Sequence, residues 1–218
     1  MWDALRLSLL VSGLAALSVG IVGVAFGYLL ARARFPGQTL LELLLTLPMI
    51  LPPTVTGYYL IILLGRNGFL GSYLYDWTGF TFVFSWQGAA LASGVVALPI
   101  MVRAAKAAFR DVPISLEHAS YVLGKDKLHT FFRITLPLAR QGLLSGLILS
   151  FARAIGEFGA TLMLAGNIPG RTQTMPLAIY EAFTTGQDEL AQFLAIVLTV
   201  LSGAVIYLTE RTLQPRRS

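Results

Sequence analysis

The sequence contains no cysteine, little charge and only two histidines. Without cysteine, neither a disulfide nor a thiolate metal site can form. The two histidines, His118 and His129, lie in one polar loop, so a histidine-based metal site is not expected. The pattern G-x-x-x-x-G-K-[ST], which holds nucleotide phosphates in P-loop proteins, is also missing. Because no nucleophile–base set is visible either, we expect a chain that is not an enzyme and holds no cofactor of its own.

Long apolar runs take the place of charged surface. Charged residues make up 12% of the chain, against about 25% in soluble domains. A helix needs roughly 20 apolar residues to cross a bilayer. The runs therefore predict an all-α polytopic membrane protein, with a single transmembrane domain over residues 1–218. The five expected spans cover residues 7–31, 43–65, 80–102, 141–165 and 190–209. The first run is longer than a signal-peptide core of about 7 to 15 residues, so we expect a retained helix.

Lysine and arginine gather between the expected spans in three segments. These residues are Arg32 and Arg34, then Arg103, Lys106, Arg110, Lys125, Lys127, Arg133 and Arg140, and finally Arg211, Arg216 and Arg217. Cytoplasmic loops of membrane proteins accumulate such residues. The pattern predicts a multi-pass protein of the inner or plasma membrane, with its N-terminus outside and its C-terminus in the cytosol. Since the basic residues follow the topology, a nucleic-acid partner is not expected.

The two expected external loops, residues 66–85 and 166–189, are too rich in glycine and aromatic residues for plain solvated linkers. Within the second loop, residues 175–184 are expected to form a short helix packed at membrane depth. This helix could count as a sixth span.

Three prolines, Pro48, Pro52 and Pro53, fall inside the second expected span. Proline removes a backbone donor and bends a helix, and a bilayer tolerates such a break only where neighbours or a cavity satisfy the backbone. Two interpretations stay open. One is a simple kink, and the other is a broken helix that lines a transport path.

The longest cytosolic segment, residues 111–137, is predicted to fold as two short helices that meet at a glycine; we call it the knob. Pro113 suits a first helical turn that Asp111 could cap. Gly124 is expected to end the first helix in a left-handed turn. The second helix is expected to run from about Asp126 to a stop at Leu136 and Pro137. A mere connector could be much shorter, since loops between helices of a bundle take about 2 to 8 residues.

The knob resembles the signature loop of permeases of binding-protein-dependent ABC importers. That signature reads EAA, three residues, Gly, nine residues, Ile, any residue and Leu-Pro. The matching positions are Gly124, Ile134, Leu136 and Pro137. The EAA triplet falls on His118, Ala119 and Ser120, with Glu117 one position early. The resemblance implies that the knob is a coupling helix that docks on a separate ATP-hydrolysing subunit, and that these eight residues take part in the coupling.

A finer resemblance, to the permease subunits of molybdate importers, extends over nearly the whole chain. It is carried by FPGQTLLELLLTLPMILPPTVTGYYL, SFARAIGEFGAT and GNIPGRTQTMPLAIY. It implies the type I ABC importer permease fold and the import of molybdate, and also of tungstate, by alternating access. The implied partners are a second copy of this chain, two ATPase subunits that bind ATP and magnesium, and one soluble molybdate-binding protein.

Arg153 and Glu157 stand out as charges within the apolar run from 141 to 170. Intramembrane charges usually face the bundle interior or a cavity, and residues four apart on a helix can pair. One interpretation is a structural ion pair. In the other, Arg153 faces the path of an oxyanion and Glu157 acts as counterion or gate. We favour a mixture, with Gly156 and Gly159 permitting close helix approach at this gate. Arg171 and Thr172, in the second expected external loop, are weaker candidates for contact with the oxyanion.

Three other classes compete with a molybdate importer. A sulfate or thiosulfate ABC permease is a close relative and shares the ARA-x-GEFGA pattern. A secondary anion transporter or channel would need no ATPase, although it would also show broken helices and an intramembrane ion pair. A membrane scaffold or sensor would show fewer kinked spans and no buried charges. The spacing from Gly124 to Leu136–Pro137 argues against the secondary transporter or channel.

Overall fold

A computed structural model describes residues 2–213, and the side chains as far as Tyr207. All regular structure in this part is helical. The helices are α1 (Trp2–Arg32), α2 (Gln38–Ile50), α3 (Pro53–Leu64), α4 (Gly71–Thr78), α5 (Trp86–Asp111), α6 (Ile114–Val122), α7 (Lys127–Thr130), the π-helix η1 (Phe131–Thr135), α8 (Leu136–Ile155), α9 (Gly159–Ala165), α10 (Met175–Thr184) and α11 (Asp188–Leu213). The expected basic tail at Arg211, Arg216 and Arg217 lies outside the described side chains.

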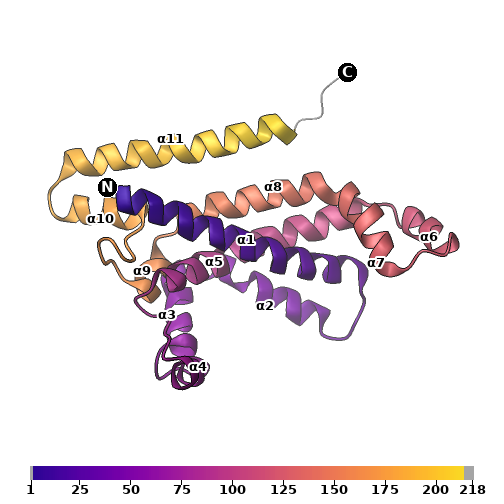
Figure 1. The fold of residues 1–218 in the computed structure, drawn as a ribbon, viewed down its shortest axis with the longest axis horizontal. Helices are drawn as coiled ribbons and strands as arrows, with labels where there is room; N and C mark the ends of the chain where they lie inside the picture. Colours follow the sequence, from indigo (N-terminus) through magenta and orange to yellow (C-terminus); the bar gives the residue numbers. More distant parts are fainter. Residues whose placement is uncertain (1, 214–218) are drawn as a thin grey trace.

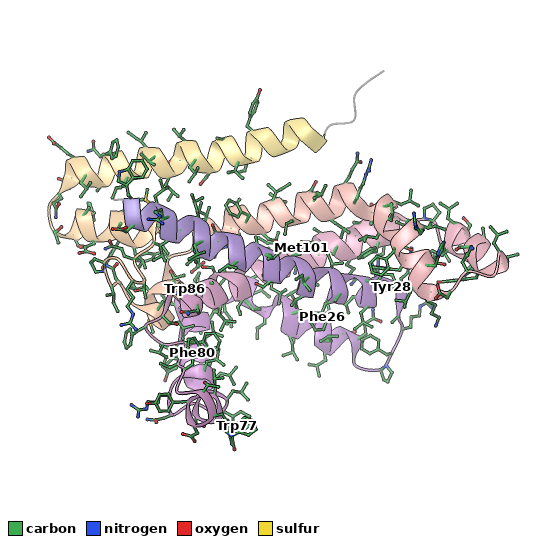
Figure 2. The ribbon with its side chains drawn as sticks, viewed as in Figure 1. Phe26, Tyr28, Trp77, Phe80, Trp86 and Met101 are labelled. Carbon is green, nitrogen blue, oxygen red and sulfur yellow. The ribbon has the colours of Figure 1, made fainter. Side chains whose placement is uncertain are left out.

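Helices α1, α5 and α8 form the centre of the molecule and pack against one another along much of their length. Glycines on the two outer helices bring them close to α5. A Cβ added at Gly27 would lie 2.4 Å from the Cβ of Ala105, and one at Gly142 would lie 2.6 Å from that of Ala108. In a membrane the hydrophobic effect does not drive helices together, and close packing at small residues such as these stabilises their contact instead. Met101 is fully buried where α1 crosses α5 (Figure 2).

The bundle has two distinct ends (Figure 1). Helices α6 and α7 of the knob project at one end, whereas α10 and the start of α1 lie at the other. Helix α11 runs along the edge and packs on α10 and α8. Helices α3 and α4 form an arm that leaves the bundle sideways, and Trp77 lies near its tip (Figure 2). Among the described residues, four helices are long and apolar enough to cross a membrane, and the bent pair α2–α3 could supply a fifth.

The expected second span, 43–65, is two helices instead of one. Helices α2 and α3 are bent by 119°. The chain is extended at Leu51 (φ −69°, ψ 143°) and at Pro52 (φ −54°, ψ 135°). Pro53 then opens α3, a position where the missing N–H has no helical partner in any case. Pro48 stays inside α2. Of the two interpretations of these prolines, the simple kink is wrong and the helix is broken.

The expected fourth span, 141–165, is also interrupted. Helix α8 ends at Ile155, and α9 begins at Gly159 after a short non-helical step. In the other direction the helix reaches further than expected, because Lys127–Ile155 is one continuous helical segment. The predicted stop at Leu136 and Pro137 is therefore wrong.

The π-helix explains why the chain passes Pro137 without stopping. The N–H of Leu136 bonds the carbonyl of Phe131, five residues back. Such a wider turn rearranges the backbone bonds ahead of Pro137, which then occupies the first turn of α8 and needs no helical donor.

Other boundaries shift by a few residues. Helix α5 begins at Trp86, where Ser85 Oγ accepts a hydrogen bond from the N–H of Gly88 at 3.0 Å. Asp111 is the last residue of α5, and no side chain caps α6, so the expected cap by Asp111 is wrong. The helix expected over residues 175–184 is found as α10.

Candidate translocation site and coupling surface

The breaks of the two interrupted spans pack against each other. A Cβ added at Gly159, the first residue of α9, would lie 3.1 Å from the Cβ of Pro53. One turn further along α3, a Cβ at Gly57 would lie 2.7 Å from the Cβ of Met163 and 2.9 Å from the carbonyl oxygen of Ala160. A side chain at Gly57 would therefore force α3 and α9 apart, and one at Gly159 would crowd Pro53 and Thr54.

Glu157 lies inside the second break, where it makes two strong interactions. Its Oε2 is 2.7 Å from Nη1 of Arg153. Its Oε1 accepts a hydrogen bond of 2.8 Å from the N–H of Ala160. The pair thus forms, but across the end of α8 rather than along one helical face as expected. The carboxylate is 2% exposed and satisfies one of the free N–H groups at the start of α9, where negative charge is also favoured.

Arg153 is the more accessible partner, because 34% of its side chain is exposed. Gly156 is exposed as well, and the nearest atom to a Cβ added there is the carbonyl oxygen of Ala152 at 3.8 Å. The close helix approach expected for both glycines is found at Gly159 and not at Gly156. Instead, Gly156 borders an apolar cleft of about 420 Å³ together with Phe158 and Tyr180.

The eight knob residues divide into an inner and an outer set. Glu117 and Ser120 are buried, and Ile134 and Leu136 are partly buried. Ser120 and Thr130 share a hydrogen bond of 2.9 Å between their hydroxyl groups, which ties α6 to α7. The exposed members are His118, Ala119, Gly124 and Pro137.

Three apolar side chains, which we call the apolar tip, are strongly exposed on the knob. Val122 is 88% exposed, Leu123 is 76% exposed and Leu128 is 69% exposed. Gly124 between them has φ of +75°, as expected for a helix that ends in a left-handed turn. Exposed apolar residues grouped in this way are typical of a protein interaction site.

The structure also contains an ion pair that sequence reasoning missed. Nζ of Lys106 in α5 lies 2.5 Å from Oε1 of Glu42 in α2, with side-chain exposures of 14% and 38%. The sequence placed Lys106 in a basic loop, because the third span was expected to end at 102. The alanines on both sides of Lys106 were the available signal for a longer packed helix.

The second external loop is held by side-chain hydrogen bonds. Glu181 Oε2 accepts from Asn167 Nδ2 at 2.8 Å and also from Gln173. Thr172 is buried, and its Oγ1 accepts from the N–H of Ile168 at 3.0 Å. Arg171 is exposed. Thr172 therefore has a structural role in this loop.

Residues 23–218 match the family model described as the inner membrane component of binding-protein-dependent transport systems. The chain belongs to this family. The molybdenum transport system permease protein ModB of Escherichia coli (strain K12) is 46% identical over 96% of this permease and 92% of its own length. The sulfate transport system permease protein CysW of Synechococcus elongatus is 35% identical over 94% of this permease and 72% of its own length.

The fold of this permease is that of a type I ABC importer. A solved structure of the MetNI methionine ABC transporter in an inward-facing conformation has a TM-score of 0.74. The match covers 98% of this permease and 95% of that chain at 18% identity.

Proposed function

We propose that this chain is the transmembrane permease subunit of an ATP-driven importer of molybdate and tungstate. The observation that carries the proposal is the 46% identity to a molybdenum permease, which extends over 96% of this chain and 92% of the relative. The sulfate permease is more distant, at 35% identity. The match extends over the interrupted spans as well as the knob, which supports a shared function over the whole chain.

The proposed assembly contains two copies of this permease, two ATPase subunits and one soluble binding protein. The chain lacks a P-loop, so ATP and magnesium would be bound by the ATPase subunits. The basic residues of the knob support a cytosolic location for it. With the knob inside, the start of α1 and the loop around α10 would lie outside, because they are at the opposite end of the bundle. The proposal keeps the C-terminus in the cytosol, as the basic residues after the last span predict.

Coupling to the ATPase is assigned to the exposed set of knob residues. His118, Ala119, Gly124 and Pro137 would contact the ATPase directly, together with the apolar tip. Glu117, Ser120, Ile134 and Leu136 would act from within, because they are buried or partly buried.

The translocation path is assigned to the two meeting breaks. The side chain of Arg153 is 34% exposed, and a guanidinium group carries donors that suit an oxyanion. Glu157 weakens this attraction from the buried side, and a weak site suits passage, since the anion must also leave. Pro52 and Pro53 keep α3 separate from α2, and Pro53 lies against Gly159. Pro48, inside α2, and Gly156, at the end of α8, are assigned to the path as well.

The alternative with specific support is a sulfate or thiosulfate permease, because a sulfate permease also matches over most of the chain. A secondary transporter is less well supported, since an exposed apolar knob has no role without a docking partner.

Reconstitution tests the proposal. The permease would be assembled with its ATPase and binding protein in liposomes, and ATP hydrolysis would be compared for molybdate, tungstate and sulfate. We expect stimulation and uptake with molybdate and tungstate. Stimulation by sulfate alone would favour the alternative. The permease without its ATPase serves as control and should hydrolyse no ATP.

A further inference from the structure

A buried polar cluster joins the knob to the end of α1. Oε1 of Glu117 accepts hydrogen bonds from Nη2 of Arg32 at 2.8 Å and from Nε of Arg32 at 3.1 Å. The hydroxyl of Thr135 donates a third bond to the same oxygen at 2.9 Å. One carboxylate oxygen therefore connects α1, α6 and the π-helix.

Arg32 also holds the link between α5 and α6. Its Nη2 donates to the carbonyl oxygen of Val112 at 2.9 Å. The side chains of Arg32 and Glu117 are 14% and 8% exposed, so both charges are largely withdrawn from water. A charge-assisted pair with several further hydrogen bonds is the arrangement in which a buried ion pair is well satisfied.

An aromatic cluster lies at the same junction. The ring of Tyr28 contacts Phe109 with a centroid distance of 5.3 Å and Phe131 with one of 4.9 Å, both edge to face. Tyr28 lies on the last turns of α1, near the knob (Figure 2). The polar cluster ties the end of α1 to α6 and the π-helix, and the aromatic cluster ties the end of α1 to the end of α5 and the π-helix.

The inner position of Glu117 separates it from the exposed apolar tip. Val122 and Leu123 face solvent, whereas Glu117 is 6% exposed and Ser120 is 4% exposed. While its oxygen is bonded to Arg32 and Thr135, Glu117 is not presented to a protein that docks on the tip.

We propose that Arg32 and Glu117 form a clamp that makes α1 and the knob move as one body. Glu117 is then a positioning residue, and it does not contact the ATPase. The clamp rests on the proposed function, since it concerns how the movement of a docked ATPase reaches the membrane helices. Through Arg32 this movement reaches α1 directly, in addition to α5 and α8, which are continuous with the knob in sequence.

A double-mutant cycle tests the clamp in the reconstituted importer. The variants are Arg32→Gln, Glu117→Gln and the double variant, with Arg34→Gln as control. Arg34 is two residues away and exposed. The control substitution therefore removes the same charge without changing the polar cluster. We expect each single variant to lower molybdate uptake per ATP hydrolysed about fivefold or more. Fivefold is about the smallest effect that coupled sites in proteins typically have on each other. The double variant should be no worse than the worse single variant, because both remove the same interaction.

The complex itself should assemble normally in all variants. If Glu117→Gln weakened ATPase association while Arg32→Gln did not, Glu117 would be an ATPase contact and the clamp would be wrong. Equal uptake per ATP in all four variants would also overturn the clamp.

A second measurement does not depend on transport. Because the chain has no cysteine, spin labels can be placed at Val22→Cys on α1 and Val122→Cys on α6 of the purified permease. Both positions are exposed, at 40% and 88%. We expect a narrow distance distribution that broadens in Arg32→Gln and stays narrow in Arg34→Gln. An unchanged distribution in Arg32→Gln would overturn the clamp. If the wild-type complex imports no molybdate, the proposed function fails, and the spin-label result still decides the clamp.

Discussion

Gly159 of α9 lies against Pro53 of α3, so close that a Cβ on the glycine would meet the proline Cβ at 3.1 Å and the backbone nitrogen of Thr54 at 3.2 Å. The contact joins the points at which two expected spans are interrupted. Non-helical backbone at membrane depth is tolerated only where protein or a water-filled cavity surrounds it. Each break therefore supplies part of the environment that the other needs, and the region between them is the best candidate for a gate.

The close contact of α3 with α9 predicts that Gly57→Ala destabilises the permease. The new methyl group would lie 2.7 Å from Met163 Cβ and 2.9 Å from the Ala160 carbonyl oxygen, so backbone must move. Overpacking of this kind costs about 1–3 kcal/mol. The measurement is the midpoint of thermal unfolding in detergent, with Gly13→Ala as control. Gly13 has no atom within 4 Å of an added Cβ. Equal midpoints for the two variants would show that α3 and α9 can separate freely.

The two roles of Glu157 predict different outcomes for two substitutions. Glu157→Gln keeps an oxygen that can accept from the N–H of Ala160, whereas Glu157→Ala leaves this fully buried N–H without a partner. An unsatisfied buried donor costs about 1–3 kcal/mol. We expect the alanine variant to unfold at a clearly lower temperature than the glutamine variant. Identical unfolding would mean that the carboxylate acts only as the counterion of Arg153.

The assignment of Arg153 to the path predicts slower transport in Arg153→Ala, by about tenfold if the lost interaction is worth 1.4 kcal/mol in the rate-limiting step. Uptake of molybdate by the reconstituted importer measures this rate. The affinity of the soluble binding protein should not change. Arg171→Ala is the matched control, because Arg171 is an exposed arginine of the external loop. Normal uptake by Arg153→Ala would leave this residue with a structural role alone.

The sequence was sufficient for the features that depend on local composition. Apolar runs predicted helices that can span a membrane, and α10 was expected over the residues where it is found. The left-handed turn at Gly124 was also predictable, because only glycine adopts a φ of +75° freely. Two prolines in succession indicated the break before α3, although a simple kink was an equal alternative.

The remaining features depend on contacts between distant residues. No proline marks the break after Ile155; its conformation is held by the bond from Ala160 to Glu157 and by the contact of Gly159 with Pro53. Pro137 suggested a helix stop, but a π-turn carries the helix through it. Arg32 and Glu117 are 85 residues apart, so no local pattern could show that they pair.

The exposed left-handed turn of the knob allows its proposed docking role to be separated from folding. An added Cβ at Gly124 has no neighbour within 4 Å, so Gly124→Ala meets only the backbone penalty of about 1–2 kcal/mol for a positive φ. Gly124→Trp carries a similar backbone penalty and adds bulk beside the apolar tip. We expect the alanine variant to bind the ATPase and the tryptophan variant to fail, as measured by co-purification of the two subunits. Full co-purification of the tryptophan variant would exclude Gly124 from the docking surface.

The ion pair between Lys106 and Glu42 predicts a rescue in the double variant. Glu42→Gln leaves the Lys106 ammonium group, which is 14% exposed, without its partner. The expected loss is about 1–3 kcal/mol, between the values for exposed and for buried pairs. Adding Lys106→Met should recover most of this loss, because no unpaired charge remains in the contact between α2 and α5. Thermal unfolding measures the effect, and Glu189→Gln, at an exposed position of α11, is the control. If Lys106→Met gave no recovery in the Glu42→Gln background, the loss would come from the missing attraction between the two side chains and not from an unpaired Lys106 charge.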